Sequence, residues 1–89
     1  MNVMYHSRFK KDIVKIRDRK LKDLLLGKLH ELKDAPGLEQ VAGVRKLSGH
    51  ATAYRIRIGD YRLGFFLEDP ETVRLQRFVK RNDIYKLFP

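Results

Sequence analysis

Residues 54–66 read Tyr-Arg-Ile-Arg-Ile-Gly-Asp-Tyr-Arg-Leu-Gly-Phe-Phe, and this stretch decides the fold. Apolar residues alternate with arginines around Gly59-Asp60, and a two-residue Gly-Asp connection between alternating runs is typical of a β-hairpin. A two-residue loop also sets the register, because residues that face each other across a hairpin lie on the same face of the sheet. The predicted pairs are Tyr54 with Phe65, Arg55 with Gly64, Ile56 with Leu63, Arg57 with Arg62, and Ile58 with Tyr61.

This register gives the hairpin one apolar face and one basic face. The apolar face is expected to pack on the core and carries Tyr54, Ile56, Ile58, Tyr61, Leu63 and Phe65. The basic face carries Arg55, Arg57 and Arg62 around Gly64. Like charges directly opposite each other cost stability, so Arg57 across from Arg62 is unfavourable in a purely structural hairpin. We interpret the basic face as an anion-binding surface where Gly64 leaves the backbone open to a phosphate; a solvated polar face is the alternative.

The composition indicates one basic, folded domain. Eighty-nine residues are too few to divide between two cores, so a single domain is expected over residues 1–89. Apolar residues make up 43% of the chain, as in ordinary globular proteins. Twenty Lys and Arg against eleven Asp and Glu leave a net charge of +9. Nucleic acid is therefore the leading class of partner, with an acidic protein or an anionic membrane surface as alternatives.

Several kinds of chemistry lack the residues that they need. The chain has no cysteine, which removes disulfides, thiol catalysis and thiolate zinc sites, and which is consistent with a cytoplasmic location. No apolar run is long enough to span a bilayer and no apolar signal segment is present, so no membrane insertion is expected. The carboxylates are scattered and the histidines (His6, His30 and His50) are isolated in sequence. No metal and no other cofactor is therefore expected.

Upstream of the hairpin the pattern predicts one strand and two helices. Residues 2–6 suit a strand, and Ser7 is the expected N-cap of a basic amphipathic helix. Residues 21–33 continue in helical period after a bend placed at residues 18–20, which predicts an antiparallel helical hairpin. The second helix is expected to end at Asp34-Ala35-Pro36-Gly37, because the residue before a proline leaves the helical region and glycine follows.

Downstream of the hairpin the pattern predicts a third strand and a short helical turn. Asp69-Pro70-Glu71 is typical of a tight turn, and residues 72–79 suit a strand antiparallel to the second hairpin strand. The hydrophobic period slips inside this strand, so either both of its faces are buried or a bulge near Arg77 turns the later side chains to the other face. Asn82 or Asp83 is expected to cap a last helical turn.

The segment between the second helix and the hairpin, residues 38–51, is expected to be a loop in which Arg45 and Lys46 stay exposed. The predicted architecture is therefore α+β. It consists of an N-terminal strand, an antiparallel helical hairpin, a three-stranded antiparallel meander and a short C-terminal helical turn, with the sheet packed on the helices.

The end of the third strand is expected to return toward the Gly59 turn, because this strand pairs with the second hairpin strand. The residues expected to converge there are Arg55, Arg57, Arg62, Lys80, Arg81 and Tyr85. Such a cluster suits cleavage of RNA by its own 2′-hydroxyl, which needs no metal in principle. That reaction needs a group to take the 2′ proton, a group to protonate the leaving 5′ oxygen, and positive charge around the phosphorane.

Three motifs resemble the RelE/ParE superfamily of bacterial toxin–antitoxin toxins: Lys-Leu-x-Gly at 46–49, the run at 54–63, and Val-Lys-Arg-Asn-Asp-Ile-Tyr at 79–85. The resemblance covers nearly the whole chain and implies a toxin with a cognate acidic antitoxin, acting in translation inhibition or plasmid stabilisation. In the RelE branch it implies a metal-independent endoribonuclease (an mRNA interferase) that cuts messenger RNA on the ribosome. In the ParE branch it implies an inhibitor of DNA gyrase that does not cut nucleic acid. A plain RNA-binding domain is the third interpretation.

The resemblance also implies roles for single residues. Arg55 and Arg57 match paired basic positions, Arg62 a phosphate-clamping arginine, Arg81 a proton donor or charge stabiliser, and Tyr85 a base-stacking tyrosine. Further RNA contacts are expected from Lys80, Arg77, Lys86, Arg45 and Lys46. RelE has lysines where Arg55 and Arg57 stand, and many relatives have histidine in place of Lys80. Arginine is a worse proton acceptor than lysine, so the catalytic set of this chain favours positioning and charge stabilisation.

Overall fold

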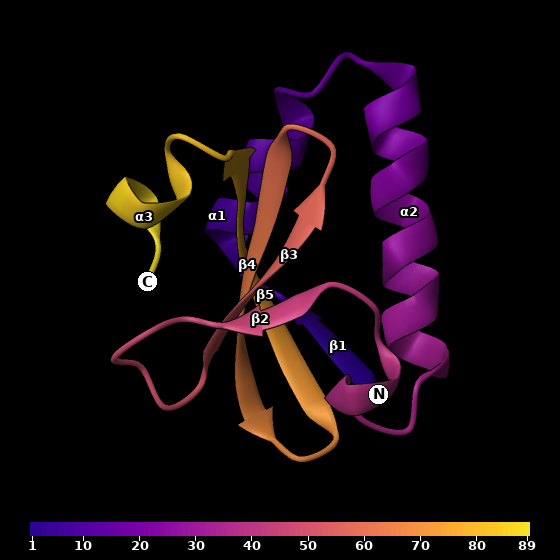
Figure 1. Ribbon diagram of the computed structural model, residues 1–89. Coiled ribbons are helices and arrows are strands. Elements are labelled where there is room, and N and C mark those ends of the chain that lie inside the picture. The colour runs from indigo at the N-terminus through magenta and orange to yellow at the C-terminus, as the bar shows by residue number, and fades with distance from the viewer.

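The computed structural model describes residues 1–89 and shows a five-stranded sheet with helices on both faces (Figure 1). The elements are β1 (Asn2–Tyr5), α1 (Ser7–Val14), α2 (Arg19–Asp34), the 3₁₀ turn η1 (Leu38–Gln40), β2 (Val44–Lys46), β3 (Ala53–Ile58), β4 (Tyr61–Asp69), β5 (Thr72–Lys80) and α3 (Ile84–Leu87). The strand order is β1-β5-β4-β3-β2. β1 runs parallel to β5, and all other neighbours are antiparallel. The predicted α+β order is confirmed, with β2 as an additional strand.

The β3–β4 hairpin forms in the predicted register. Arg57 faces Arg62, Arg55 faces Gly64 and Ile56 faces Leu63. Gly59 adopts a φ of 59°, a left-handed conformation that glycine takes without the steric cost other residues incur. The predicted apolar face is the inner face of the sheet, which packs on α1 and α2, and the basic face is the outer one.

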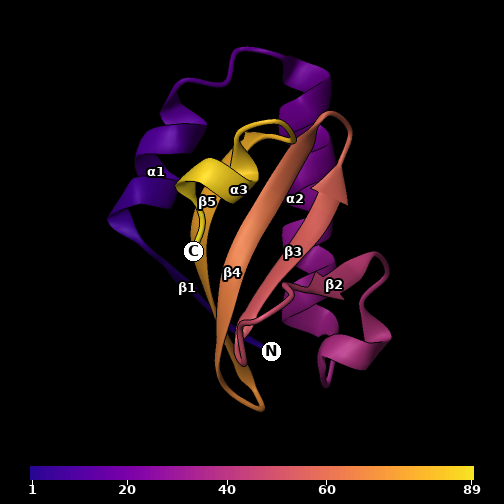
Figure 2. The same cartoon turned by 60° about the vertical axis from the view of Figure 1, so that its left-hand side comes forward.

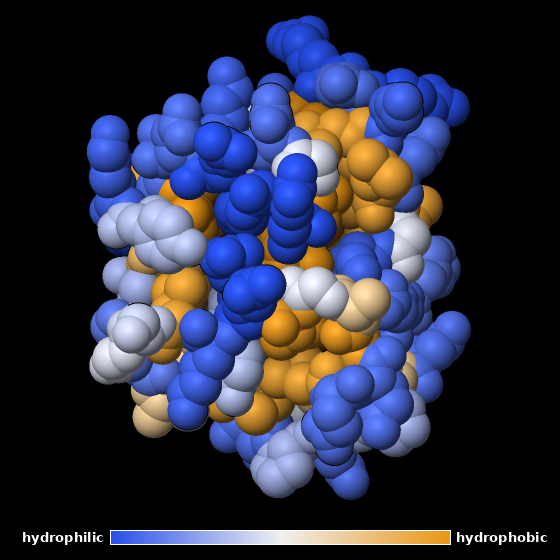
Figure 3. Space-filling view, in the orientation of Figure 1, coloured by the Kyte–Doolittle hydropathy of each residue, from blue (hydrophilic) through white to orange (hydrophobic).

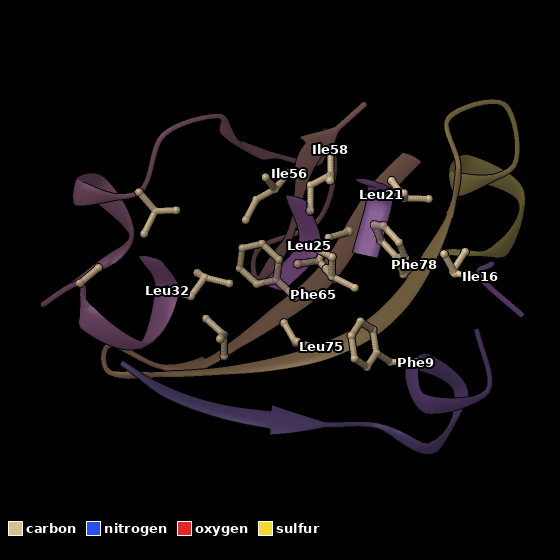
Figure 4. Packing of buried hydrophobic residues seen from close by; sticks show 14 residues of the cluster. Phe9, Ile16, Leu21, Leu25, Leu32, Ile56, Ile58, Phe65, Leu75 and Phe78 are labelled. Atoms are coloured by element: carbon tan, nitrogen blue, oxygen red, sulfur yellow. The ribbon is translucent and has the colours of Figure 1, made fainter. Parts of the chain in front are cut away.

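The main core lies between the inner face and the two longer helices. Phe9 of α1 and Leu25 and Leu32 of α2 are buried against Phe65 and Phe78 of the sheet. Figure 4 shows these side chains pointing toward one another from the helices and the strands. α1 packs on β5, whereas α2 packs on β1 and β3, so the two helices together cover the sheet.

The helix boundaries need two corrections. The bend predicted at residues 18–20 lies between Val14 and Arg19 instead, so residues 19 and 20 already belong to α2. α1 ends at Val14 and α2 begins at Arg19, where the Asp18 carboxylate accepts from the Leu21 N–H at 3.2 Å. The prediction of Ser7 as the first N-cap is wrong. His6 caps α1 instead, because its Nδ1 accepts from the Arg8 N–H at 3.1 Å. None of the helices combines the length and apolar character needed to cross a membrane.

The irregularity predicted in the strand at residues 72–79 is confirmed, and it is a β-bulge in β5. Gly64 pairs with Arg77 and Phe65 with Leu75, which leaves Gln76 without a partner on β4. An extra residue inverts the alternation of every side chain after it. Phe78 therefore returns to the inner face, opposite Leu63, where a regular strand would have turned it away from the core.

The expectation that residues 38–51 form only a loop is wrong. Val44–Lys46 makes the edge strand β2, which pairs antiparallel with β3. A three-residue strand is too short to show a periodic pattern, and its existence depends on the partner strand. α2 also holds this segment: Glu31 accepts from the Ala42 N–H at 2.9 Å, and Lys28 donates to the Ala42 carbonyl at 3.1 Å.

The outer face also carries a small apolar cluster that was not predicted. Figure 2 shows α3 in front of the sheet while α2 passes behind it. Ile84 and Phe88 from the C-terminal segment pack there on Ala53 and Leu47, with Phe66 and Val79 alongside. The outer face is therefore divided between this apolar cluster and the arginines.

Candidate nucleic-acid interface

Four arginines gather on the outer face beside the β3–β4 turn, and we call Arg55, Arg57, Arg62 and Arg81 the arginine cluster. The hairpin register places the first three on one face. Arg81 follows β5, and its N–H donates to the Asp60 carbonyl at 2.8 Å, which ties this residue to the hairpin turn. Figure 3 shows the most hydrophilic side chains gathered in front of β3 and β4, bordered by apolar surface.

The arginine cluster carries positive charge that no carboxylate neutralises. The three salt bridges of the structure all involve other cations. Burial is the largest cause that lowers the pKa of Arg62, and the charges of Arg55, Arg57 and Arg81 lower it further. Its Nη1 donates to the carbonyls of Gly59 at 3.1 Å and Tyr61 at 2.9 Å. The cluster is thus held together against its own repulsion, which suits a surface that receives an anion.

Tyr85 stands at the border of the arginine cluster. Its hydroxyl oxygen accepts a hydrogen bond from Arg55 Nε at 2.8 Å, and the residue is 64% exposed. The hydrogen bond fixes the outer end of the ring while the ring itself remains accessible. An exposed aromatic ring beside cations can stack on a nucleobase whose phosphate the cations hold.

The prediction that Gly64 opens the backbone to a phosphate is wrong. The Phe88 ring covers this glycine so closely that an added Cβ would lie 2.7 Å from Phe88 Cδ2. Sequence reasoning missed Phe88 and Ile84 because their contacts span the whole fold. The available signal was a glycine on an outer-face position combined with an aromatic residue shortly after the last helical turn.

Two of the predicted RNA-contacting residues lie outside the arginine cluster. Arg77 donates from Nε and Nη2 to the Asp12 carboxylate at 2.8 and 3.1 Å, and this hydrogen bonding raises its pKa. Its charge is therefore used within the protein. Lys80 pairs with Tyr61, which places it toward the inner face, so its expected convergence with the arginines is wrong. The bulge at Gln76 decides which face of the sheet each later residue of β5 takes. It puts Val79, and not Lys80, on the outer face.

The remaining predicted contacts are exposed but not clustered. Arg45 faces Arg55 across the β2–β3 pair, so it extends the basic outer face toward the edge of the sheet. Lys46 faces Tyr54 and thus leans to the inner side of that edge. Lys86 is exposed on α3. Contact between RNA and these three residues stays a prediction.

The chemistry of the cluster is that of hydrogen-bond donors and fixed charge. Arginine stays protonated at neutral pH, so it donates to phosphate oxygens and does not act as a base. No group of three or more His, Asp or Glu side chains is arranged to hold a metal ion. The arrangement can therefore bind a phosphate, stabilise negative charge that develops on it, and orient a neighbouring base on Tyr85.

Comparisons with known proteins identify relatives over the whole chain. The family model described as ParE toxin of type II toxin-antitoxin system, parDE, matches residues 3–85. Toxin RelE3 of Methanocaldococcus jannaschii is 29% identical over 90 residues, covering 100% of both chains. The RelB-RelE antitoxin-toxin complex from Methanococcus jannaschii has a similar fold, with a TM-score of 0.80 at 24% identity over 97% of this chain and 99% of the other. A mutant E. coli toxin RelE in complex with an antitoxin RelBc peptide gives a TM-score of 0.68 at 26% identity, over 96% and 90% of the two chains.

Proposed function

The chain belongs to the ParE toxin family of type II toxin–antitoxin systems, and we propose that it acts as the RelE branch of this superfamily does, as a ribosome-dependent endoribonuclease that cleaves messenger RNA. It is a RelE-like toxin in sequence and fold. The observation that carries the proposal is the arginine cluster, in which four cations without a carboxylate partner surround one surface beside an exposed tyrosine. A toxin that acts only through protein contacts has no need of such a convergent phosphate-binding surface.

The proposed reaction is attack of the RNA 2′-oxygen on the adjacent phosphorus, with departure of the 5′-oxygen. The products are a 2′,3′-cyclic phosphate and a 5′-hydroxyl end. Arg57 and Arg62, which face each other across the hairpin, hold the phosphate, and Arg81 adds charge as the phosphorane forms. The cluster consists of arginines, which donate hydrogen bonds and do not act as bases, so the 2′ proton passes to water and the leaving oxygen takes a proton from water. The rate then depends on in-line positioning and charge stabilisation, which explains a need for the ribosome to hold the message.

Tyr85 is proposed to hold the base next to the scissile phosphate. Stacking of a base on an aromatic side chain contributes about 1–3 kcal/mol. The hydrogen bond from Arg55 to the tyrosine hydroxyl keeps the ring at a set position relative to the phosphate-binding arginines. Arg55 therefore positions the tyrosine, while Arg57 and Arg62 hold the phosphate.

Inhibition of DNA gyrase is the second candidate function. The observation that favours it is that the arginine cluster contains no histidine and no carboxylate that could act as a general base. A toxin that does not cut nucleic acid needs no such group. In this case the arginines contact the target enzyme or its DNA. The two candidates differ in whether messenger RNA is cut.

A cognate acidic antitoxin is the proposed partner. The net charge of +9 on this chain attracts an acidic protein. Proteins of similar fold have been solved in complexes with antitoxins. α1 and α2 present an apolar groove lined by Ile13, Val14, Ile16, Lys22, Leu25, Leu26 and Leu29. Val14 is 82% exposed in it, and the exposed Lys22 is its one charged lining residue. An antitoxin segment with one apolar and one acidic face is complementary to this groove.

Expression of the chain in growing cells separates the two candidate functions. Primer extension on several messages is expected to find breaks within translated regions, while DNA supercoiling stays unchanged. A variant carrying Arg57→Ala and Arg62→Ala should leave messages intact, whereas Arg19→Ala, which changes an exposed arginine on α2, should cut as the wild type does. Intact messages together with gyrase–DNA cleavage complexes would replace the endoribonuclease with the gyrase inhibitor.

A further inference from the structure

The contact between Phe88 and Gly64 joins the C-terminal segment to the middle of the sheet. The Phe88 ring is 2% exposed and covers the Gly64 backbone on the outer face. A Cβ at position 64 would meet Cδ2, Cγ and Cε2 of this ring at 2.7, 2.8 and 3.0 Å. Gly64 has no positive φ, so the backbone conformation does not require glycine there. The ring is what requires it.

α3 depends on this contact for its position. A helix of four residues has no stability of its own, because isolated short helices do not repay the cost of nucleation. Its anchors are Ile84 and Phe88, which belong to the apolar cluster with Leu47 and Ala53. The Phe88 ring also lies 5.1 Å from the Phe66 ring, centroid to centroid. This cluster is separate from the main core on the inner face.

Tyr85 lies between these two anchors in the chain and points to the arginine cluster. Its partner Arg55 is the cross-strand neighbour of Gly64. One cross-strand pair of the hairpin therefore receives both ends of the C-terminal segment: Gly64 receives the Phe88 ring, and Arg55 receives the Tyr85 hydroxyl. A shift of the ring on Gly64 moves α3 and with it the tyrosine.

We propose that Phe88 is a positioning residue, whose seat on Gly64 sets the place of the Tyr85 ring beside Arg55. Phe88 itself touches no substrate and acts through Tyr85. The consequence for RNA cleavage rests on the proposed endoribonuclease function, whereas the consequence for the Arg55–Tyr85 hydrogen bond does not. The two can therefore be tested separately.

A size exchange between the two positions is the direct test. Gly64→Ala adds the methyl group that the Phe88 ring excludes, so the ring must leave its seat. Phe88→Leu removes the ring and provides a smaller side chain that can turn away from the added methyl group. The double variant Gly64→Ala/Phe88→Leu is expected to recover most of what Gly64→Ala loses. A purely structural role would also give mutual rescue of stability, because contacting residues couple. The distinguishing result is loss and recovery of the Arg55–Tyr85 hydrogen bond and of kcat in variants that remain folded.

Two readouts are needed for each variant. The first is the NMR signal of Arg55 Nε–H, which the hydrogen bond to Tyr85 protects from exchange with water; Tyr85→Phe provides the reference for its loss. The second is cleavage of messenger RNA on programmed ribosomes, with kcat and KM separated. Gly64→Ala is expected to lose protection of the Arg55 proton and to lower kcat by about 100-fold, the scale of a displacement of about 1 Å at the reacting group. The melting temperature should fall, because the ring leaves the outer apolar cluster, but the protein should stay folded at the assay temperature, because the main core is untouched.

The outcomes separate the inference from the function on which it rests. Retained protection of Arg55 Nε–H and full cleavage in both Gly64→Ala and Phe88→Ala would overturn the positioning role. Absence of rescue in the double variant, with all three proteins folded, would also overturn it. If wild type and all variants fail to cut RNA while Gly64→Ala still loses the Arg55 protection, the positioning role stands and the endoribonuclease function fails.

Discussion

At the scale of single residues, the site is a set of arginines that repel one another and that the fold nevertheless holds close together. Arg62 faces Arg57 across the hairpin and has two more arginines close enough to lower its pKa. Its hydrogen bonds go to backbone carbonyls and not to a carboxylate. Such a residue contributes little to folding and is free to bind a phosphate.

Replacement of Arg62 tests this division of roles. Arg62→Ala is expected to abolish toxicity while the melting temperature holds or rises slightly, because the change removes repulsion with Arg57. Arg62→Lys keeps the charge but not the two parallel donors, so it should retain partial toxicity. A fall in stability comparable to a core truncation, about 2–5 kcal/mol, would contradict the placement of Arg62 on the exposed face.

The same residues show how far the sequence predicts the site. The two-residue turn determined the partners of Arg55, Arg57 and Arg62 correctly, because turn length and alternation are local properties. The face of Lys80 and the exposure of Gly64 were predicted wrongly, for a different reason. The parity of Lys80 depends on where a bulge falls, and the cover of Gly64 depends on a residue 24 positions later in the chain. Both are tertiary facts that a local pattern does not contain.

At the scale of elements, Asp12 joins α1 to the sheet. β1 pairs with β5 only as far as Leu75, so the rest of β5 has a free edge. α1 lies along that edge, and the Asp12 carboxylate accepts from the Phe78 N–H at 2.9 Å and from two nitrogens of Arg77. The carboxylate thus takes the place of a neighbouring strand at the bulge.

Removal of the Asp12 carboxylate should lower the free energy of unfolding. Asp12 is 6% exposed, and Asp12→Ala leaves the Arg77 guanidinium and a backbone donor without partners. Breaking a buried ion pair in this way destabilises proteins by about 3–5 kcal/mol. Asp23→Ala, at an exposed position of α2, is the matched control and should change the free energy of unfolding very little. Equal effects of the two substitutions in urea unfolding would contradict the anchoring role of Asp12.

The link between α2 and β2 through the Glu31 carboxylate should weaken in acid. The hydrogen bond from Lys28 lowers the pKa of Glu31 most, followed by that from the Ala42 N–H, and this link holds the start of β2 against α2. A carboxylate whose pKa is lower in the folded than in the unfolded state stabilises the fold above its unfolded pKa of about 4.3. That stability is lost as the pH falls through the folded value.

Glu31→Gln is the test of this pH dependence. The variant should be less stable than the wild type near neutral pH, and the difference should shrink as the pH drops below about 4.3. The free energy of unfolding, measured in urea across this range for both proteins, gives the comparison. A constant difference at all pH values would show that the charge of Glu31 is not what links α2 to β2.

The elements that the sequence predicts are those with long patterns. The helices and the hairpin extend over enough residues for periodicity and caps to locate them. β2 has three residues and shows no period, so it was missed. The four-residue α3 was predicted as a short helical turn, but its contacts with the sheet were not. The part of the site carried by β3 and β4 was therefore predictable, whereas the seat of Tyr85 was not.

At the scale of the whole molecule, charge and apolar surface are distributed over two faces. The outer face carries the arginine cluster, while α1 and α2, on the other side of the sheet, carry an apolar groove that includes Lys22. A partner that binds the groove can leave the arginines free or reach round to cover them. Both arrangements depend on attraction to a chain of net charge +9.

Association with an acidic antitoxin should accordingly depend on ionic strength. The association rate constant, measured by stopped flow with the product of a neighbouring acidic reading frame, is expected to fall steeply as salt rises, because mobile ions screen charges beyond about 10 Å at 0.1 M. The dissociation rate should change less, since apolar contacts in the groove are not screened. An association rate that is the same at low and high salt would contradict electrostatic steering as the origin of partner binding.

Cleavage of a message with a single 2′-deoxy substitution tests the central claim most directly. Purified protein is added to ribosomes programmed with a short messenger RNA, and the nucleotide 5′ to the mapped cleavage point is replaced by its 2′-deoxy form. We expect the all-ribose message to be cut to a 2′,3′-cyclic phosphate and a 5′-hydroxyl end, and the substituted message to stay intact while it still binds. Cleavage of the substituted message, or no cleavage of either with inhibition of gyrase by the same protein, would contradict it.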